Sequence, residues 1–239
     1  MLRAKVFQVL MLIFLLAGGA CSKPAETISQ ATPIENILPS NPLENPFETT
    51  KTLAESGDAQ AQLDLARMYL YGEGVPMNEA EGVKWFQLAA DQGLAEAQYT
   101  IGDWYRWAGR GFTQDDKEAA RWHHLSAEQG YLPAQRLLAN DYFWGIGDVT
   151  QDYNEAAKWY FKAAEQGDSN AQSWLGTLYY RGDGVIHDNI YALMWLNVAR
   201  IGSQTQSFRE EIESEMTAAD ISKAQELARE CVKKEYKGC

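Results

Sequence analysis

The side chains that most often carry catalysis or bind metals do not stand at spacings that would bring them together. The three histidines are His123, His124 and His187. The first two are adjacent, so on a helix their rings would point about 100° apart and could not easily share one metal ion. The HExxH, SxxK, KTG and GxSxG motifs are absent from the sequence. We therefore expect no metal centre, no cofactor and no enzymatic activity.

The other reactive side chains are three cysteines, and the first of them ends a leader-like segment. Arg3 and Lys5 precede an apolar run over residues 6–16, and small residues then lead to Cys21. The apolar part is shorter than the roughly 20 residues that span a bilayer as a helix. The pattern is typical of a secretory signal peptide, which we place at residues 1–20.

The run Ala17-Gly18-Gly19-Ala20-Cys21 resembles the lipobox of bacterial lipoproteins. The resemblance implies that Cys21 is lipidated and becomes the new N-terminus. Gly18 stands where the lipobox prefers leucine, so a soluble periplasmic or secreted protein is the alternative. The next residue, Ser22, is not aspartate. By resemblance to the Gram-negative sorting rule, that favours an outer-membrane lipoprotein facing the periplasm.

The remaining cysteines, Cys231 and Cys239, lie at the C-terminal end. Export would place them in an oxidising compartment, where a disulfide is the expected state. In the chain-entropy model, closing this short loop would stabilise the fold by about 2–3 kcal/mol. Two free thiols are the alternative. No CxxC motif is present, so thiol catalysis is not indicated.

The charge balance favours some classes of partner over others. Of 239 residues, 21 are Lys or Arg and 33 are Asp or Glu, which gives a formal net charge of −12. Removing residues 1–20 deletes two positive charges and no negative one, so the mature protein would carry −12 − 2 = −14. Nucleic acids and anionic membranes attract basic surfaces. We therefore expect a protein or peptide partner with basic character, no nucleic acid, and membrane contact only through the N-terminal lipid.

The segment after the leader has the composition of a linker. Five of the seven prolines fall between Pro24 and Pro46, among many Ser, Thr, Asn and Glu residues. No helical period or strand alternation is visible there. We interpret residues 21–46 as a disordered tether.

From Phe47 onward the sequence repeats itself every 36 or 37 residues. One tryptophan marks each unit, at Trp85, Trp122, Trp159 and Trp195. Ala-Gln pairs recur at 61–62, 97–98, 134–135 and 171–172. A Gly-x-Gly recurs at 72–74, 109–111, 145–147 and 182–184. Because these columns stay in register over four units, each unit must build the same local structure.

The spacing within one unit predicts two helices. Ala61, Leu65 and Tyr69 are four residues apart and share one face of a first helix. The Gly-x-Gly ends that helix, and Asn78 can cap the second helix, which carries Trp85. One such pair cannot bury its apolar stripe alone, whereas stacked pairs can. The repeat therefore predicts an all-α solenoid.

The pattern A-Q-x-x-[LI]-[GA]-x-x-Y followed by G-x-G and then [DN]-x-x-x-[AG]-x-x-W resembles the Sel1-like repeat, a tetratricopeptide-like family. The resemblance covers about residues 50–202. We assign residues 47–202 to a solenoid of four Sel1-like repeats, in which Thr52–Gly57 ends an N-terminal half-repeat. Residues 203–239 are predicted to form C-terminal capping helices, with Thr217 starting the last one.

The resemblance implies a scaffold that binds a partner through the concave face lined by the first helices of the repeats. Some Sel1-like proteins have been associated with penicillin binding or weak β-lactamase activity. An enzyme or ligand-binding protein of cell-wall metabolism is therefore the alternative. The first-helix positions not needed for packing are the candidate partner-binding residues: Asp64, Arg67, Tyr71, Asp103, Trp107, Asn140, Trp144, Trp174 and Arg181.

One column of this set stacks three aromatic residues, Tyr71, Trp107 and Trp144, ahead of Arg181. Tyr, Trp and Arg are enriched at binding hot spots. The alternative is that these aromatic rings pack between repeats beside the Gly-x-Gly turns.

Overall fold

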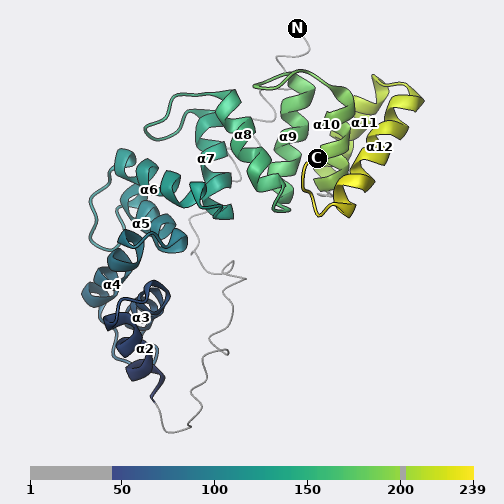
Figure 1. Cartoon of the computed structure of the whole chain (residues 1–239). Helices are drawn as coiled ribbons and strands as arrows, with labels where there is room; N and C mark the ends of the chain where they lie inside the picture. The colour runs from purple at the N-terminus through teal and green to yellow at the C-terminus, as the bar shows by residue number, and fades with distance from the viewer. Residues whose placement is uncertain (1–44, 200–202) are drawn as a thin grey trace. The chain divides into compact units, whose positions relative to one another are not determined.

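The computed structural model describes residues 45–199 and 203–239. The predicted signal peptide, Cys21 and nearly all of the predicted tether lie outside the described residues. Within the described ranges the regular secondary structure consists of helices joined by turns, with no strand (Figure 1). The helices are α2 (Pro46–Glu55), α3 (Ala59–Tyr71), α4 (Glu79–Asp91), α5 (Ala95–Trp107), α6 (Asp116–Glu128), α7 (Leu132–Trp144), α8 (Tyr153–Ala164), α9 (Ser169–Arg181), α10 (Asn189–Ala199), α11 (Ser203–Ser214) and α12 (Ala218–Lys233).

The helices follow the predicted repeat. The first helices of the four units are α3, α5, α7 and α9, and the second helices are α4, α6, α8 and α10. From α2 to α10, each helix packs against the next one in sequence, and α10 also contacts α11 and α12. This succession of neighbour contacts confirms the four-repeat α-solenoid. The half-repeat is α2, which begins at Pro46, a residue well suited to the first turn of a helix.

Small side chains let neighbouring helices approach closely. A Cβ added to Gly102 in α5 would lie 2.5 Å from the ring of His123 in α6. One added to Gly176 in α9 would lie 2.9 Å from the carbonyl oxygen of Ala192 in α10. Trp122, Trp159 and Trp195 are buried, and Trp85 is partly buried against the core. The tryptophan column read from the sequence therefore contributes to the core in each unit.

The turn from first to second helix has the predicted chemistry. Gly72, Gly145 and Gly182 end their helices in the left-handed conformation, at φ of 73°, 62° and 71°. The second unit differs, because its extra residue places Ala108 at this position with φ of 51°. Each second helix then begins at an Asn or Asp cap whose side chain accepts backbone N–H bonds, at Asn78, Asp115, Asp152 and Asp188.

Each of the first three caps is followed, three residues later, by a glutamate, a spacing typical of a capping box, in which the glutamate would accept from the N–H of the cap residue. The structure differs, because the N–H groups of the three cap residues donate to backbone carbonyls instead. Glu81, Glu118 and Glu155 pair with a cation three residues further along the helix, at distances of 3.8, 2.9 and 3.1 Å. The caps therefore rest on the Asn and Asp oxygens, and the glutamates add exposed ion pairs of small energetic weight.

The buried glutamines of the Ala-Gln pairs link one unit to the next. Gln62, Gln98, Gln135 and Gln172 each donate to a backbone carbonyl near the end of the preceding second helix, at 3.1 to 3.3 Å. Three of them also accept, at 2.7 Å, from a glutamine at the end of their own unit, namely Gln92, Gln129 and Gln166. We call this repeated network the glutamine ladder.

The C-terminal helices cover the end of the fourth unit. Thr217 accepts from the Asp220 N–H and caps α12, as predicted. A disulfide joins Cys231 to Cys239. The Gly238 N–H donates to Glu165 at 2.8 Å, so the closed loop reaches back to the third unit. In the part of the chain that the structure describes, no helix combines the length and apolar character needed to cross a membrane.

Candidate functional site

The structure divides the nine predicted partner-binding residues into two groups. Five lie along the middle of the first helices and are partly buried: Asp64, Arg67, Asp103, Asn140 and Trp174. The other four lie at the C-terminal ends of the same helices and are exposed: Tyr71, Trp107, Trp144 and Arg181. The two groups have different surroundings, so we describe them separately.

Arginines join the first helices of successive repeats. Arg67 in α3 bonds to Asp64 at 3.5 Å and also donates to Glu96 in α5. Arg106 in α5 donates to both carboxylate oxygens of Asp141 in α7, one of them at 3.2 Å.

A third bridge runs from Arg136 in α7 to Asp168, the cap of α9, at 3.1 Å. One arginine bridge thus spans each junction between first helices. Arg67 belongs to these structural bridges and is not a free cation.

Asp103 and Asn140 also bond within the fold. The Nε2 atom of the fully buried His123 lies 3.1 Å from an Asp103 carboxylate oxygen. Tyr160 donates its hydroxyl hydrogen bond to Asn140 at 2.6 Å. His123 itself therefore serves packing. The sequence did not predict the contact between His123 and Asp103, because the histidine is not repeated in the other units.

Burial governs the titration of the groups in this region. It raises the pKa of Tyr131 to about 12, and the nearby Glu96 carboxylate adds to the rise. It also raises the pKa of Asp141, against the opposing effect of the Arg106 hydrogen bond. Burial also raises the pKa of Tyr99, and the nearby Asp103 carboxylate raises it further. The packing of the repeats on one another therefore raises the pKa of all three groups.

The exposed group is arranged differently. The exposed fractions of Tyr71 and Trp107 are 59% and 74%, and that of Trp144 is 40%. Trp144 contacts Trp174 edge to face, with ring centroids 6.0 Å apart. Trp174 in turn stacks on Tyr160 at 5.9 Å, and Phe143 lies 4.8 Å from it. Trp174 is thus a packing residue that supports Trp144, whereas Trp107 projects into solvent.

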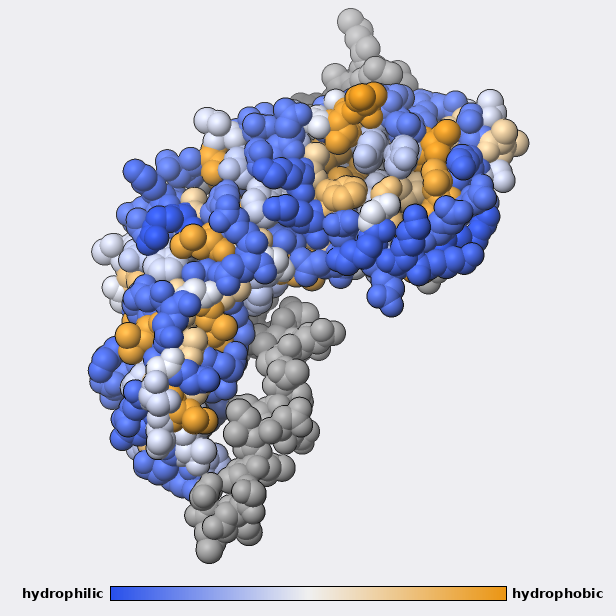
Figure 2. All heavy atoms as spheres, viewed as in Figure 1, coloured by the Kyte–Doolittle hydropathy of each residue, from blue (hydrophilic) through white to orange (hydrophobic). Residues whose placement is uncertain are grey.

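Further apolar side chains, which the repeat pattern did not predict, are exposed in the turns that follow these helix ends. Met77, Ile146 and Ile186 are exposed by 72%, 49% and 88%. All three fall in the turns between first and second helices. Figure 2 shows apolar residues, in orange, surrounded by hydrophilic ones at several places on the visible face. Met77, Ile146 and Ile186 occupy different positions in their turns, so they do not form a repeated column in the sequence.

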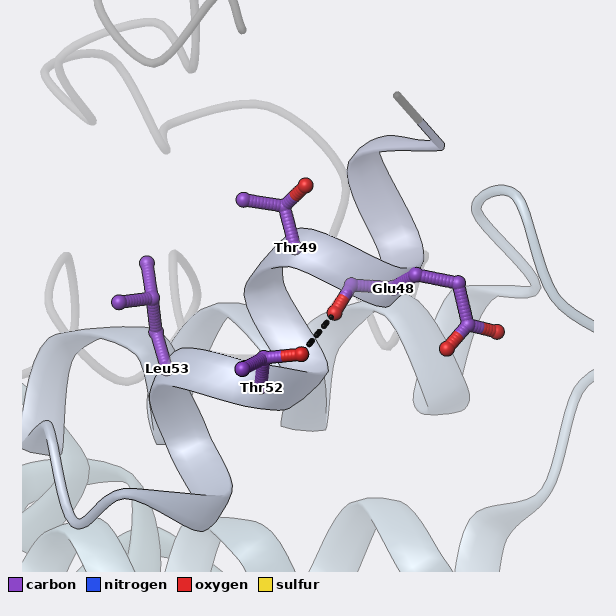
Figure 3. A pocket seen from close by; sticks show the side chains of 4 residues that line it. All are labelled: Glu48, Thr49, Thr52 and Leu53. Carbon is purple, nitrogen blue, oxygen red and sulfur yellow. Dashed lines mark hydrogen bonds between the residues drawn. The ribbon is translucent and has the colours of Figure 1, made fainter. Parts of the chain in front are cut away.

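A small surface pocket lies elsewhere, on the terminal helix α2. It is lined by Glu48, Thr49, Thr52 and Leu53 (Figure 3). Thr52 uses its hydroxyl to donate to the Glu48 carbonyl at 2.8 Å. None of the predicted site residues reaches this pocket. Among the described residues, no group of three or more His, Cys, Asp or Glu side chains could hold a metal ion.

Comparisons with known proteins agree with this architecture. The family model described as the Sel1 repeat matches residues 59–94, 95–131, 132–168 and 169–199. Each match begins at the start of a first helix or within one residue of it. A comparison with curated proteins gives no match.

Two solved structures illustrate the likeness. A Sel1 repeat protein from Oxalobacter formigenes is 33% identical, with a TM-score of 0.63, over 70% of this chain and 48% of that one. The protein c5321, a protective antigen of uropathogenic Escherichia coli strains that displays an SLR fold, is 25% identical with a TM-score of 0.50. That match covers 80% of this chain and 50% of c5321. The chain therefore spans about half the length of these solved relatives.

Proposed function

Because the chain belongs to the Sel1 repeat family, a family whose helical repeats typically bind other proteins, we propose that it is a protein–protein interaction scaffold. The partner contacts the exposed ends of the first helices, at Tyr71, Trp107, Trp144 and Arg181. Asp64, Arg67, Asp103, Asn140 and Trp174 lie beside this surface and hold the helices that present it. A scaffold of this kind needs no catalytic group.

The observation that carries the proposal is the exposure of Trp107. Of the four repeat tryptophans, Trp85 is partly buried and the other three, Trp122, Trp159 and Trp195, are buried, as expected for the largest apolar side chain. Trp107 is 74% exposed, and Trp144 occupies the equivalent place one repeat later. Two tryptophans presented at the ends of successive first helices supply large contact areas with little rotamer entropy to lose. That favours a binding surface over packing between repeats.

The test compares two double variants of the full chain. We expect Trp107→Ala with Trp144→Ala to reduce, by at least about tenfold, the partner recovered by crosslinked pull-down from the native envelope. The matched control is Leu88→Ala with Leu125→Ala, which removes exposed apolar side chains from the second helices α4 and α6. Far-UV circular dichroism should show unchanged helicity for both. Equal capture by the two variants, or loss of helicity in the first, would contradict the proposal.

The cellular location forms a second part of the proposal. We propose an outer-membrane lipoprotein that faces the periplasm and is held by a lipid on Cys21. The lipobox-like run before Cys21 and the acidic balance of the chain support this, because an acidic protein needs a lipid to stay at an anionic surface. Cys21→Ser should move the protein from the membrane fraction to the soluble periplasmic fraction. Unchanged membrane association of that variant would argue against lipid anchoring.

A further inference from the structure

The exposed apolar side chains are concentrated on one edge of the solenoid. Eleven large hydrophobic side chains are exposed in the described residues. Six of these eleven lie in or beside the four turns that lead from a first helix to a second helix. They are Tyr71, Met77, Trp107, Trp144, Ile146 and Ile186. We call residues 71–79, 107–116, 144–152 and 181–188 the turn edge.

The turns that lead from a second helix to the next first helix provide an internal comparison. They comprise residues 55–58, 91–94, 128–131 and 165–168. None of the eleven exposed hydrophobic side chains falls in these segments. They too carry acidic residues, among them Glu55, Asp91 and Glu128. The two edges therefore share acidity, and only the turn edge combines it with exposed apolar groups.

The turn edge is strongly acidic. Its eight acidic residues are Glu73, Glu79, Asp115, Asp116, Asp148, Asp152, Asp183 and Asp188, and its two basic residues are Arg110 and Arg181. The net charge is therefore 2 − 8 = −6. Both arginines are engaged within the edge, because Arg110 pairs with Glu79 at 2.9 Å and Arg181 with Asp183 at 2.8 Å. An incoming partner meets a row of carboxylates interrupted by apolar side chains.

We propose that the turn edge binds a cationic amphipathic segment of a partner protein, in which Lys or Arg residues alternate with apolar ones. This inference rests on the proposed scaffold function and names the chemistry of its partner. Burial of the exposed apolar groups supplies the contact energy. The carboxylates select Lys and Arg and speed their encounter, and the indole faces accept the same cations. An anionic lipid surface would be repelled by this charge.

The test measures binding of defined peptides to the full chain by fluorescence anisotropy. The probe is a labelled peptide of alternating Lys and Leu, compared with a Lys–Ser and a Glu–Leu peptide of equal length. We expect saturable binding of the Lys–Leu peptide alone. Met77→Ser with Ile146→Ser and Ile186→Ser should weaken that binding at least about tenfold. These side chains are exposed in turns, so unchanged circular dichroism is expected.

A second pair of variants separates specific recognition from general acidity. The triple variant Glu73→Gln with Asp116→Asn and Asp148→Asn should also weaken binding of the Lys–Leu peptide at least about tenfold. The matched control neutralises three carboxylates on the other edge: Glu55→Gln, Asp91→Asn and Glu128→Gln. Binding by the control should stay within about twofold of the parent protein.

Three outcomes would overturn the inference. Equal weakening by the two charge variants would mean that only diffuse acidity attracts the peptide. Equal affinity for the Lys–Ser and Lys–Leu peptides would show that apolar side chains contribute nothing to binding. Binding to phosphatidylcholine vesicles without binding to any peptide would identify a lipid occupant. A further combination separates this inference from the scaffold function. If no peptide binds, but Trp107→Ala with Trp144→Ala still abolishes recovery of the native partner by crosslinked pull-down, the scaffold function stands and only the proposed partner chemistry is wrong.

Discussion

At the scale of single residues, the closest contacts are made where side chains are smallest. Gly176 in α9 faces the backbone of α10, and an added Cβ would lie 2.6 Å from the Cγ atom of Leu196 and 2.9 Å from the Ala192 carbonyl oxygen. A leucine side chain can shift, but a helix backbone within a packed array cannot move without disturbing its neighbours. The close contact between α9 and α10 therefore requires glycine at position 176.

Gly176→Ala should lower the free energy of unfolding by about 1–2 kcal/mol. Overpacking costs about 1–3 kcal/mol, and the better helix propensity of alanine returns up to about 1 kcal/mol. Thr177→Ala is the control, because it is the next residue of the same helix and is only partly buried. Urea unfolding followed by circular dichroism measures both variants. A Gly176→Ala protein as stable as the parent would show that α9 and α10 can separate freely.

Residue types repeated in register were predictable, and single occurrences were not. Each tryptophan of the repeated column is recognisable because it recurs in four units. Trp174 occurs in only one unit, so the sequence grouped it with the binding surface, whereas the structure packs it against Tyr160. The contact depends on α8 and α9 being neighbours in space, which spacing along the chain does not reveal for an unrepeated residue.

At the scale of helices, the glutamine ladder holds each unit to the next. Gln135 donates to the Ala127 carbonyl at 3.2 Å and accepts from Gln166 at 2.7 Å. Gln172 donates to the Ala164 carbonyl at 3.1 Å. Gln62 likewise donates to the Ala54 carbonyl at 3.2 Å and accepts from Gln92 at 2.7 Å. Comparing a change at Gln62 with one at Gln92 therefore separates the two bonds.

Replacing the ladder glutamines with methionine keeps their length and removes their hydrogen bonds. Gln62→Met should destabilise the fold by about 1 kcal/mol more than Gln92→Met, since it removes both bonds rather than only the one that Gln92 donates to Gln62. The two variants are to be compared by chemical denaturation under identical conditions. An equal loss of stability would show that the bond from Gln62 to the Ala54 carbonyl contributes nothing.

The sequence revealed the ladder only in part. The Ala-Gln pairs and the glutamines before Gly93, Gly130 and Gly167 form visible columns. Their periodicity indicated a structural role, but the bonding pattern required the position of one unit on the next. The arginine bridges were harder still to predict. Their partners are separated by 29, 35 and 32 residues, so they form no regular column.

At the scale of the whole molecule, the described residues form an array in which each helix mainly contacts its neighbours in sequence. The apolar stripe of each unit is covered by the next, and α11 and α12 cover α10 at the C-terminal end. The array can therefore leave its turn edge open without weakening its core. Because the interior is packed while a row of turns stays exposed, an interaction scaffold is the function that the structure supports best.

The most direct test of this account is site-specific photocrosslinking in the cells that make the protein. A photoreactive amino acid is placed at Trp107, and in a parallel strain at Leu88, which is exposed on the second helix α4. If Trp107 lies in a surface that binds a partner protein, position 107 gives a discrete protein adduct and position 88 gives none. No protein adduct at position 107, or the same adducts from both positions, would contradict the scaffold function.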